Sequence, residues 1–149
     1  MGIVINQPLT LSLDDILGQL NISNPEHPHK EPILAGGPVN VERGFVLHDD
    51  TSNTWSSSLQ INDKLCLTSS RDILDAIAMD KGPGHSLVAL GYAGWGAGQL
   101  EDELAENAWL TAPADSDIIF NTPIELRASR AAAKLGVDLA LISSEAGHA

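Results

Sequence analysis

The chain has 149 residues and a formal net charge of -12, from 20 Asp and Glu against 8 Lys and Arg. This length suits one domain with a single core, and the negative charge disfavours nucleic acid and anionic membranes, which repel it. A lone cysteine, Cys66, excludes an intramolecular disulfide, and no Cys-x-x-Cys pair is present. Because no apolar run reaches the roughly 20 residues of a membrane span, we expect a cytoplasmic protein with one domain over residues 1–149.

The first elements are predicted to be a strand and a short helix. Residues 2–7 carry no charge and predict a strand that ends at Pro8. Ser12 is positioned to cap a helix, with Asp15 three residues later to complete a capping box. The apolar stripe of this helix is formed by Leu13, Ile16, Leu17 and Leu20.

Short strands dominate the next part of the chain. Alternating or apolar runs predict them at residues 33–39, 43–48, 57–61 and 64–69. In the second run Phe45 and Leu47 share one face. The polar pair Asn62-Asp63 separates the last two runs, which predicts a hairpin and therefore antiparallel pairing.

Helices are more frequent in the second half. Ser70 is a candidate cap for a helix that ends near Asp80, and residues 86–92 form the most apolar strand, which we expect to be central. Another helix extends to about Asn107, and a last strand is predicted at residues 137–142. The helix after residue 122 has the clearest signals, which are Thr122 as cap, Pro123, Glu125 and the stop Gly136. This mixture predicts an α+β domain.

The glycines at positions 94, 96 and 98 raise the question of a phosphate-binding loop. Their spacing is G-x-G-x-G, which differs from the G-x-G-x-x-G of dinucleotide-binding loops, and no Gly-Lys-Ser/Thr follows. Glu101, Asp102 and Glu103 occupy the first turn of the next helix, where a bound phosphate would need the positive end of the helix dipole. We therefore expect a structural turn, with Leu100, Leu104 and Ala108 as the buried stripe of the helix.

Other candidate sites are incomplete in the sequence. A divalent ion could contact His27 and His29, or His48 and Asp50, but a third ligand at fixed spacing is missing, so we expect no metal. Ser69, Ser70 and Cys66 are possible nucleophiles, yet none lies in G-x-S-x-G or has a base supplied by the local sequence.

The basic residues have similarly ordinary explanations. Arg43 and Arg71 are candidates for binding an anion together, although we favour surface salt bridges for both. Arg127, Arg130 and Lys134 lie on one face of a predicted helix and give the only sequence support for DNA binding. Cations near the end of a helix also complement its dipole, and we favour that explanation.

Several segments together resemble the AlgH/YqgE family of bacterial proteins. They are "GIVINQP", "LAGGPV", "RGFVLH", "LTSSRDIL", "ALGYAGWGAGQLEDEL", "NAWLTAPAD" and the terminal "GHA", in this order over nearly the whole chain. The resemblance implies a single compact α+β domain with a mixed, largely antiparallel, barrel-like sheet and flanking helices. Some members are named as transcriptional regulators, but the family is otherwise uncharacterised and supplies no reaction.

The resemblance also implies candidate positions for a binding groove and for structural turns. The recurrent polar positions of the family correspond to Arg43, His48, Arg71, Asp72, Trp95, Gln99, Glu103 and Asn107. Its recurrent glycines correspond to Gly36, Gly37, Gly91 and Gly94. Family members usually have a further N-terminal segment with a strand, so we expect an exposed apolar edge at residues 2–6 that promotes self-association.

These observations favour a non-enzymatic binding or regulatory protein without a cofactor, which acts through protein or small-molecule partners. One alternative is a small hydrolase that uses His48 and Asp72. Another is direct binding to DNA, which the charge of the chain disfavours.

Overall fold

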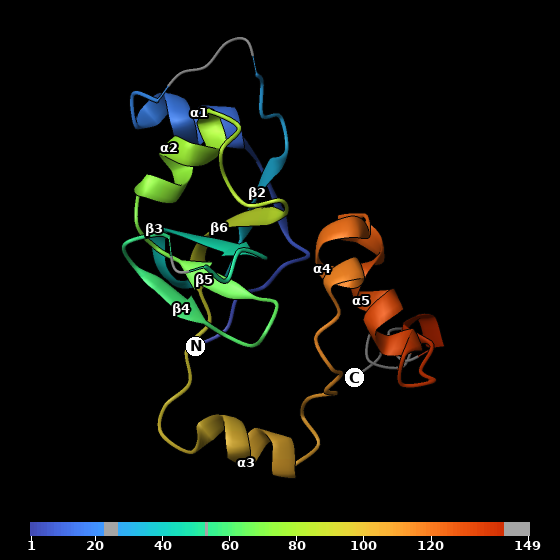
Figure 1. Cartoon of the computed structure of the whole chain (residues 1–149). Coiled ribbons are helices and arrows are strands. Elements are labelled where there is room, and N and C mark those ends of the chain that lie inside the picture. Colours follow the sequence, from blue (N-terminus) through green and yellow to red (C-terminus); the bar gives the residue numbers. More distant parts are fainter. Residues whose placement is uncertain (23–26, 53, 142–149) are drawn as a thin grey trace. The chain divides into compact units, whose positions relative to one another are not determined.

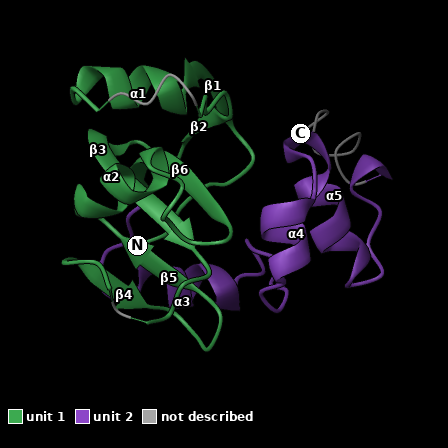
Figure 2. Ribbon diagram, turned by 45° about the horizontal axis from the view of Figure 1, so that its top comes forward, with its two compact units in different colours: residues 1–93 green, residues 94–149 purple. Residues whose placement is uncertain are grey.

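The computed structural model describes residues 1–22, 27–52 and 54–141. Contacts between Cα atoms divide the chain into two compact units, Met1–Ala93 and Gly94–Ala149 (Figure 2). The sheet lies in the first unit with helices α1 (Leu13–Gln19) and α2 (Asp72–Ala78), and the regular elements described in the second unit are helices. The expectation of one domain over residues 1–149 stays a prediction.

The first unit is built on a mixed six-stranded sheet with the order β1-β2-β6-β3-β5-β4. The strands are β1 (Pro8–Ser12), β2 (Pro32–Ala35), β3 (Val39–His48), β4 (Ser58–Gln60), β5 (Cys66–Thr68) and β6 (Ser86–Tyr92). Strands β2 and β6 are parallel and the other neighbours are antiparallel, which confirms the largely antiparallel character. The prediction that the sheet closes into a barrel was wrong, because β1 and β4 lie at opposite edges and do not pair within the described residues. Both edges are short and offer few backbone groups for pairing.

The predicted strand at residues 2–7 was also wrong. The amides of this segment bond to two different places: Gly2 N donates to Ala93 O at 2.8 Å, and Val4 N donates to Gly36 O at 2.8 Å. The segment therefore forms isolated contacts in place of a continuous ladder. Strand β1 begins at Pro8, where the missing N–H of proline is tolerated at a sheet edge. Self-association through the N-terminal edge stays a prediction.

Two helices pack on one face of this sheet (Figure 1). Helix α1 (Leu13–Gln19) begins at the expected capping box, in which Asp15 N donates to Ser12 Oγ and Ser12 N donates to Asp15 Oδ2. Helix α2 (Asp72–Ala78) ends two residues earlier than expected. The core between helices and sheet consists of Leu13, Leu17, Ile33, Val46, Ile73, Ile77, Ala78 and Val88.

The predicted hairpin and central strand are confirmed. Strands β4 and β5 are antiparallel neighbours, and the turn between them is closed by Ile61 N donating to Leu65 O at 2.9 Å. Strand β6 lies between β2 and β3, which explains its apolar sequence.

The second unit contains α3 (Gln99–Ala105), α4 (Ser116–Asn121) and α5 (Ile124–Ala133). All seven described residues of α3 are at least partly exposed, so the expected buried stripe with Leu100, Leu104 and Ala108 was wrong for this helix. Helix α4 was not predicted. It begins after Asp115, whose Oδ1 accepts hydrogen bonds from Asp117 N and Ile118 N.

Helix α5 has the expected stop but a different start. Gly136 has a φ of 74°, as expected for a helix stop, and its N donates to Ala133 O. The Thr122 hydroxyl does not cap α5, because it donates to Asp117 O at 3.0 Å.

The last predicted strand, at residues 137–142, was wrong within the described residues. Residues 139–141 are helical, because Asp138 accepts hydrogen bonds from Ala140 N through its side chain and from Leu141 N through its carbonyl. Residue 142 lies outside the described residues.

Candidate ligand-binding site

Unit Met1–Ala93 has a pocket of about 230 Å³ between its two helices and the sheet. We call the apolar residues that line it the apolar wall: Ile16, Leu20, Phe45, Val46, Leu74, Val88 and Leu90. They come from α1 and its C-cap residue and from α2, β3 and β6, which lie close together in this unit (Figure 1). The pocket is therefore formed by segments that are far apart in the sequence.

One polar edge of the pocket is formed by Ser69, Ser70 and Arg71, which follow β5, and its other polar lining residues are Gln19, Glu42 and Thr68. The Nη2 atom of Arg71 donates to Leu20 O at 2.6 Å, and Arg71 Nε lies 3.8 Å from Asp75 Oδ1. Because Leu20 is the C-cap residue of α1, this contact places a positive charge at the negative end of the helix. Arg71 thus links α1 and α2 beside the pocket.

Arg43 lies on β3 between two residues that line the pocket, Glu42 and Gly44. Its Cζ atom lies 5.3 Å from the ring centroid of Phe45. The guanidinium is thus engaged in a cation–π contact.

His48 lies behind the pocket in a chain of buried and partly buried hydrogen bonds. Its side chain and that of Thr68, which lines the pocket, are completely buried. Asp50 N donates to His48 Nδ1 at 3.2 Å, so the proton of the neutral ring is on Nε2. The chain then runs from His48 Nε2 to Thr68 Oγ1 at 2.7 Å, from Thr68 to Ser58 Oγ at 2.7 Å and from Ser58 to Trp55 O.

This arrangement keeps the imidazole neutral. Burial lowers the pKa of His48, and the nearby carboxylates of Asp50 and Asp49 oppose this effect. Both ring nitrogens have partners, so neither has a lone pair directed at a bound molecule. The geometry supports a structural role for His48.

We expect this lowered pKa to make the stability of the protein depend on pH. In the unfolded chain His48 binds a proton near its ordinary pKa of 6.5, whereas the folded chain binds it only at lower pH. The contribution of His48 is therefore complete above pH 6.5 and is lost as the pH falls from 6.5 through the folded pKa. Urea unfolding at pH 7.5, 6.5 and 5.5 measures this loss, which His48→Gln should reduce.

The matched control for this experiment is His27→Gln, which changes a half-exposed histidine. This variant should lose as much stability between pH 7.5 and pH 5.5 as the wild type does. The carboxylate contacts do not interfere, because the folded pKa of Asp49, Asp50 and Asp72 is lowered from 3.8 and their contributions are lost only below that value. An unchanged pH dependence in His48→Gln would contradict the assignment.

Asp72 is the centre of a second polar cluster. Its Oδ1 accepts a hydrogen bond from Ser70 Oγ at 2.5 Å, and its Oδ2 accepts from Ser56 N and Ser56 Oγ at 2.8 and 2.9 Å. The hydrogen bond from Ser70 is the main cause of the lowered pKa of Asp72. The Ser70 hydroxyl is therefore bonded to Asp72 and does not form the predicted side-chain cap of α2. Within the described residues, no hydrogen bond joins Asp72 to His48.

Three of the other predicted site residues meet in unit Gly94–Ala149. Glu103 Oε2 accepts hydrogen bonds from the indole N–H groups of Trp95 at 3.0 Å and Trp109 at 2.8 Å, while its Oε1 accepts from Gln99 Nε2 at 3.1 Å. These hydrogen bonds lower the pKa of Glu103, and the one from Trp109 has the largest effect. Asn107 is at the end of this segment with a φ of 58°. Sequence analysis missed Trp109, although its position six residues after Glu103 was visible.

The cluster around Glu103 is satisfied by its own members. The Gln99 side-chain oxygen also accepts from Gly96 N at 2.9 Å, so the amide connects the glycine turn to Glu103. The rings of Trp95 and Trp109 are 5.9 Å apart at an angle of 69°, an edge-to-face contact. These contacts support a role in holding the turn before α3.

Three glycines of the first unit, Gly36, Gly37 and Gly91, permit close approach of its backbone segments. A Cβ atom at Gly36 would overlap Gly91 O, and one at Gly37 would overlap the backbone of Tyr92 and Ala93. Gly91 has a φ of 76°, and a Cβ atom there would overlap Gly37 O. This geometry supports a structural role for these glycines. Gly94 lies after β6, in the loop before α3.

The basic face proposed for DNA binding is partly engaged within its own unit. Arg127 is only 7% exposed, and its Nε donates to Thr122 O at 3.2 Å. Burial lowers the pKa of Arg127. Lys134 Nζ forms an ion pair with Asp115 at 2.5 Å. Of the three cations, Arg127 and Lys134 thus have structural contacts, which weakens the case for a DNA-reading face.

The described residues also bear on metal and membrane binding. Among residues 1–22, 27–52 and 54–141, no group of three or more His, Cys, Asp or Glu side chains could hold a metal ion. No helix in this part of the chain is long and apolar enough to cross a membrane. Cys66 is completely buried, and burial raises the pKa of its thiol, which disfavours a nucleophilic role.

The AlgH-like family model matches residues 1–140. The chain belongs to the AlgH-like family. It is 56% identical over 149 residues to a UPF0301 protein of Saccharophagus degradans and 55% identical over 149 residues to one of Thioalkalivibrio sulfidiphilus. All of the chain is covered in both comparisons, together with 73% and 80% of the respective relatives.

Two solved structures are similar to this AlgH-like chain. The solution structure of the AlgH protein from Pseudomonas aeruginosa has 49% identity and a TM-score of 0.78, and the match covers all of this chain and 79% of that one. A crystal structure of the protein DIP2367 from Corynebacterium diphtheriae has 14% identity and a TM-score of 0.62, over 86% of this chain and 68% of that one. The second similarity concerns the fold alone.

Proposed function

We propose that this AlgH-like chain is a non-enzymatic binding protein and that the pocket of unit Met1–Ala93 holds its ligand. The observation that carries the proposal is the apolar wall with a polar edge at Ser69, Ser70 and Arg71. A concave, mainly apolar surface with a few polar groups on one side is the usual form of a small-molecule site.

The pocket also limits the size of the ligand. Its volume of about 230 Å³ is below the roughly 300–1,000 Å³ of pockets that hold drug-sized molecules. We therefore propose a compact ligand whose apolar part contacts Leu74 and Val88 and whose polar group faces Ser69 and Arg71.

The polar groups around the pocket support binding over hydrolysis. A general base needs a basic atom within hydrogen-bond reach of the substrate. His48 Nε2 contacts Thr68, while Nδ1 accepts from a backbone N–H. Asp72 is occupied by Ser70 and Ser56. The hydrolase alternative therefore requires both residues to give up their present partners.

A regulatory role, which the names of some family members suggest, is compatible with this proposal. A small ligand in the pocket would change contacts of α1 and α2, and these helices would transmit binding to a protein partner. Direct contact with DNA is less favoured because the chain carries a net charge of -12.

Filling the pocket tests the proposal. Gly44 lines it, and a Cβ atom there would meet only Leu90 Cδ2 at 4.0 Å, which is ordinary contact. The substitution Gly44→Val adds side-chain volume at a position where the Cβ atom has room, and it supplies a residue that favours strands. We expect compounds that stabilise the wild-type chain in a thermal-shift screen to bind Gly44→Val at least about tenfold more weakly.

The control is Gln60→Val, which introduces the same side chain on the exposed strand β4, away from the pocket. It should bind the same compounds as tightly as the wild type. Equal affinity of the wild type and Gly44→Val would refute the pocket as the ligand site.

A further inference from the structure

The lining of the pocket in unit Met1–Ala93 carries one charge of each sign. Glu42, Gly44 and Val46 are alternate residues of β3 and all line the pocket, as expected for one face of a strand. Arg71 lines it from the position just before α2. Among the described residues no ion pair joins Glu42 to Arg71. The pocket therefore presents both signs of charge to one bound molecule.

The positive side of the pocket retains hydrogen-bond donors. Arg71 donates through Nη2 to Leu20 O at 2.6 Å and approaches Asp75 through Nε at 3.8 Å, so neither contact uses its Nη1 group. Ser69 N donates to Ser57 O, while the Ser69 hydroxyl has no hydrogen bond to another described residue. A guanidinium and a hydroxyl at one edge of a pocket suit a carboxylate, because hydrogen bonds to a charged group are roughly twice as strong as neutral ones.

The negative side of the pocket is Glu42. Its carboxylate forms no hydrogen bond or ion pair with another described residue. An ionised carboxylate only accepts hydrogen bonds, so its best partner in a ligand is an ammonium group. Glu42 also repels a ligand that carries only negative charge, and Arg71 repels one that carries only positive charge. The two residues together therefore favour a zwitterion.

We propose that the pocket binds a free α-amino acid with an apolar side chain, such as leucine. This inference rests on the proposed function, since it names the ligand of the same pocket. The carboxylate contacts Arg71 and Ser69, the ammonium group contacts Glu42, and the side chain lies against the apolar wall. The volume of about 230 Å³ suits a molecule smaller than the drug-sized ligands of larger pockets.

Isothermal calorimetry of the full chain with three probes tests the charges of the ligand. The probes are L-leucine, isocaproate, which lacks the ammonium group, and isoamylamine, which lacks the carboxylate. We expect the wild type to bind leucine at least about tenfold more tightly than either analogue, because each analogue loses a hydrogen bond to a charged group. Equal affinity for leucine and either analogue would overturn the proposal.

Two variants assign these charges to their residues. Glu42→Gln should bind leucine at least about tenfold more weakly than the wild type but isocaproate at least as tightly, since isocaproate has no ammonium group for Glu42 to contact. Arg71→Gln should weaken the binding of leucine and not that of isoamylamine. Thermal unfolding checks each variant, because Arg71 also links α1 and α2. If Arg71→Gln does not fold, Glu42→Gln and the two analogues decide the question.

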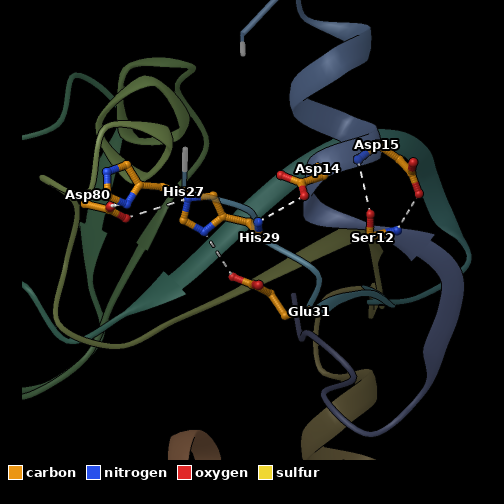
Figure 3. A network of polar contacts seen from close by, with 7 residues as sticks. All are labelled: Ser12, Asp14, Asp15, His27, His29, Glu31 and Asp80. Carbon is orange, nitrogen blue, oxygen red and sulfur yellow. Dashed lines mark hydrogen bonds and ion pairs between the residues drawn. The ribbon is translucent and has the colours of Figure 1, made fainter. Parts of the chain in front are cut away.

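The matched control is Glu31→Gln, which neutralises an exposed carboxylate of the same unit. Glu31 does not line the pocket, and its Oε1 lies 3.7 Å from His29 Nδ1 (Figure 3). This variant should retain the leucine affinity of the wild type. The proposal is overturned if leucine does not bind the wild type, or if Glu42→Gln binds leucine as tightly as Glu31→Gln does. Neither result would refute the pocket as a ligand site, which Gly44→Val tests separately.

Discussion

Replacing Gly91 by alanine is expected to destabilise the first unit by more than about 4 kcal/mol. Gly91 has a φ of 76°, a conformation that costs an L-residue roughly 1–2 kcal/mol. The larger part of the loss comes from its neighbours, since a Cβ atom would overlap Gly37 O and approach Val39 O and Val41 Cα at 3.2 Å. Urea unfolding followed by circular dichroism measures the difference from the wild type.

Two variants separate these causes. Gly98 has the same φ of 76° but no atom within 4 Å of the added Cβ, so Gly98→Ala should show only the backbone cost of roughly 1–2 kcal/mol. Gly44→Ala, in the same unit as Gly91, meets neither obstacle and should be as stable as the wild type. If Gly91→Ala loses no more stability than Gly98→Ala, the close approach of the two backbone segments is not what requires glycine.

Replacing Thr68 by valine is expected to cost about 2 kcal/mol, although the two side chains have similar shapes. The hydroxyl of Thr68 accepts from His48 and bonds to Ser58, and both Thr68 and His48 are completely buried. Its removal leaves the buried Nε2–H of His48 without an acceptor. Thermal and urea unfolding at pH 7.5 measure the loss.

The control for Thr68→Val is Ser58→Ala, which removes a later member of the same chain of hydrogen bonds. Thr68 would keep its bond to His48 in this variant, so the loss should be smaller. Full stability of Thr68→Val would show that the buried hydrogen bonds around His48 contribute nothing, and the catalytic alternative would then regain support.

Those parts of the fold that depend on local chemistry were predictable from the sequence. Ser12 and Asp15 are three residues apart and form the capping box that begins α1. The Asn62-Asp63 break marks the turn between β4 and β5, and the apolar run of β6 predicts its central place. Each signal and its consequence lie within a few residues of one another.

Other elements depend on contacts that the sequence does not display. Residues 2–7 have the composition of a strand, but their amides bond to Gly36 and Ala93, which lie far along the chain. Asp138 precedes an apolar run and nevertheless forms a helical turn, because its side chain bonds to Ala140 N. The hydrogen bond of the Asp138 side chain to the backbone competes with the hydrogen bonds of a strand, and here it favours the helical turn.

The candidate site was predictable only in part, for the same reason. The sequence predicted Arg71 as a site residue, and Arg71 lines the pocket. His48 and Asp72 were predicted as well, but they do not line the pocket and form structural hydrogen bonds with Thr68 and Ser70. The apolar wall combines residues such as Ile16 and Val88, whose proximity follows from packing of helices on the sheet. Hydrophobic periodicity identifies such residues as core and does not reveal a gap between them.

The most direct test of the central claim is methyl NMR of the chain with a compound selected by the thermal-shift screen. The binding proposal predicts that the methyl signals of Leu20, Leu74 and Val88 shift on titration, and that these shifts disappear in Gly44→Val. Shifts confined to residues outside the apolar wall, for example around Trp95, would contradict the account.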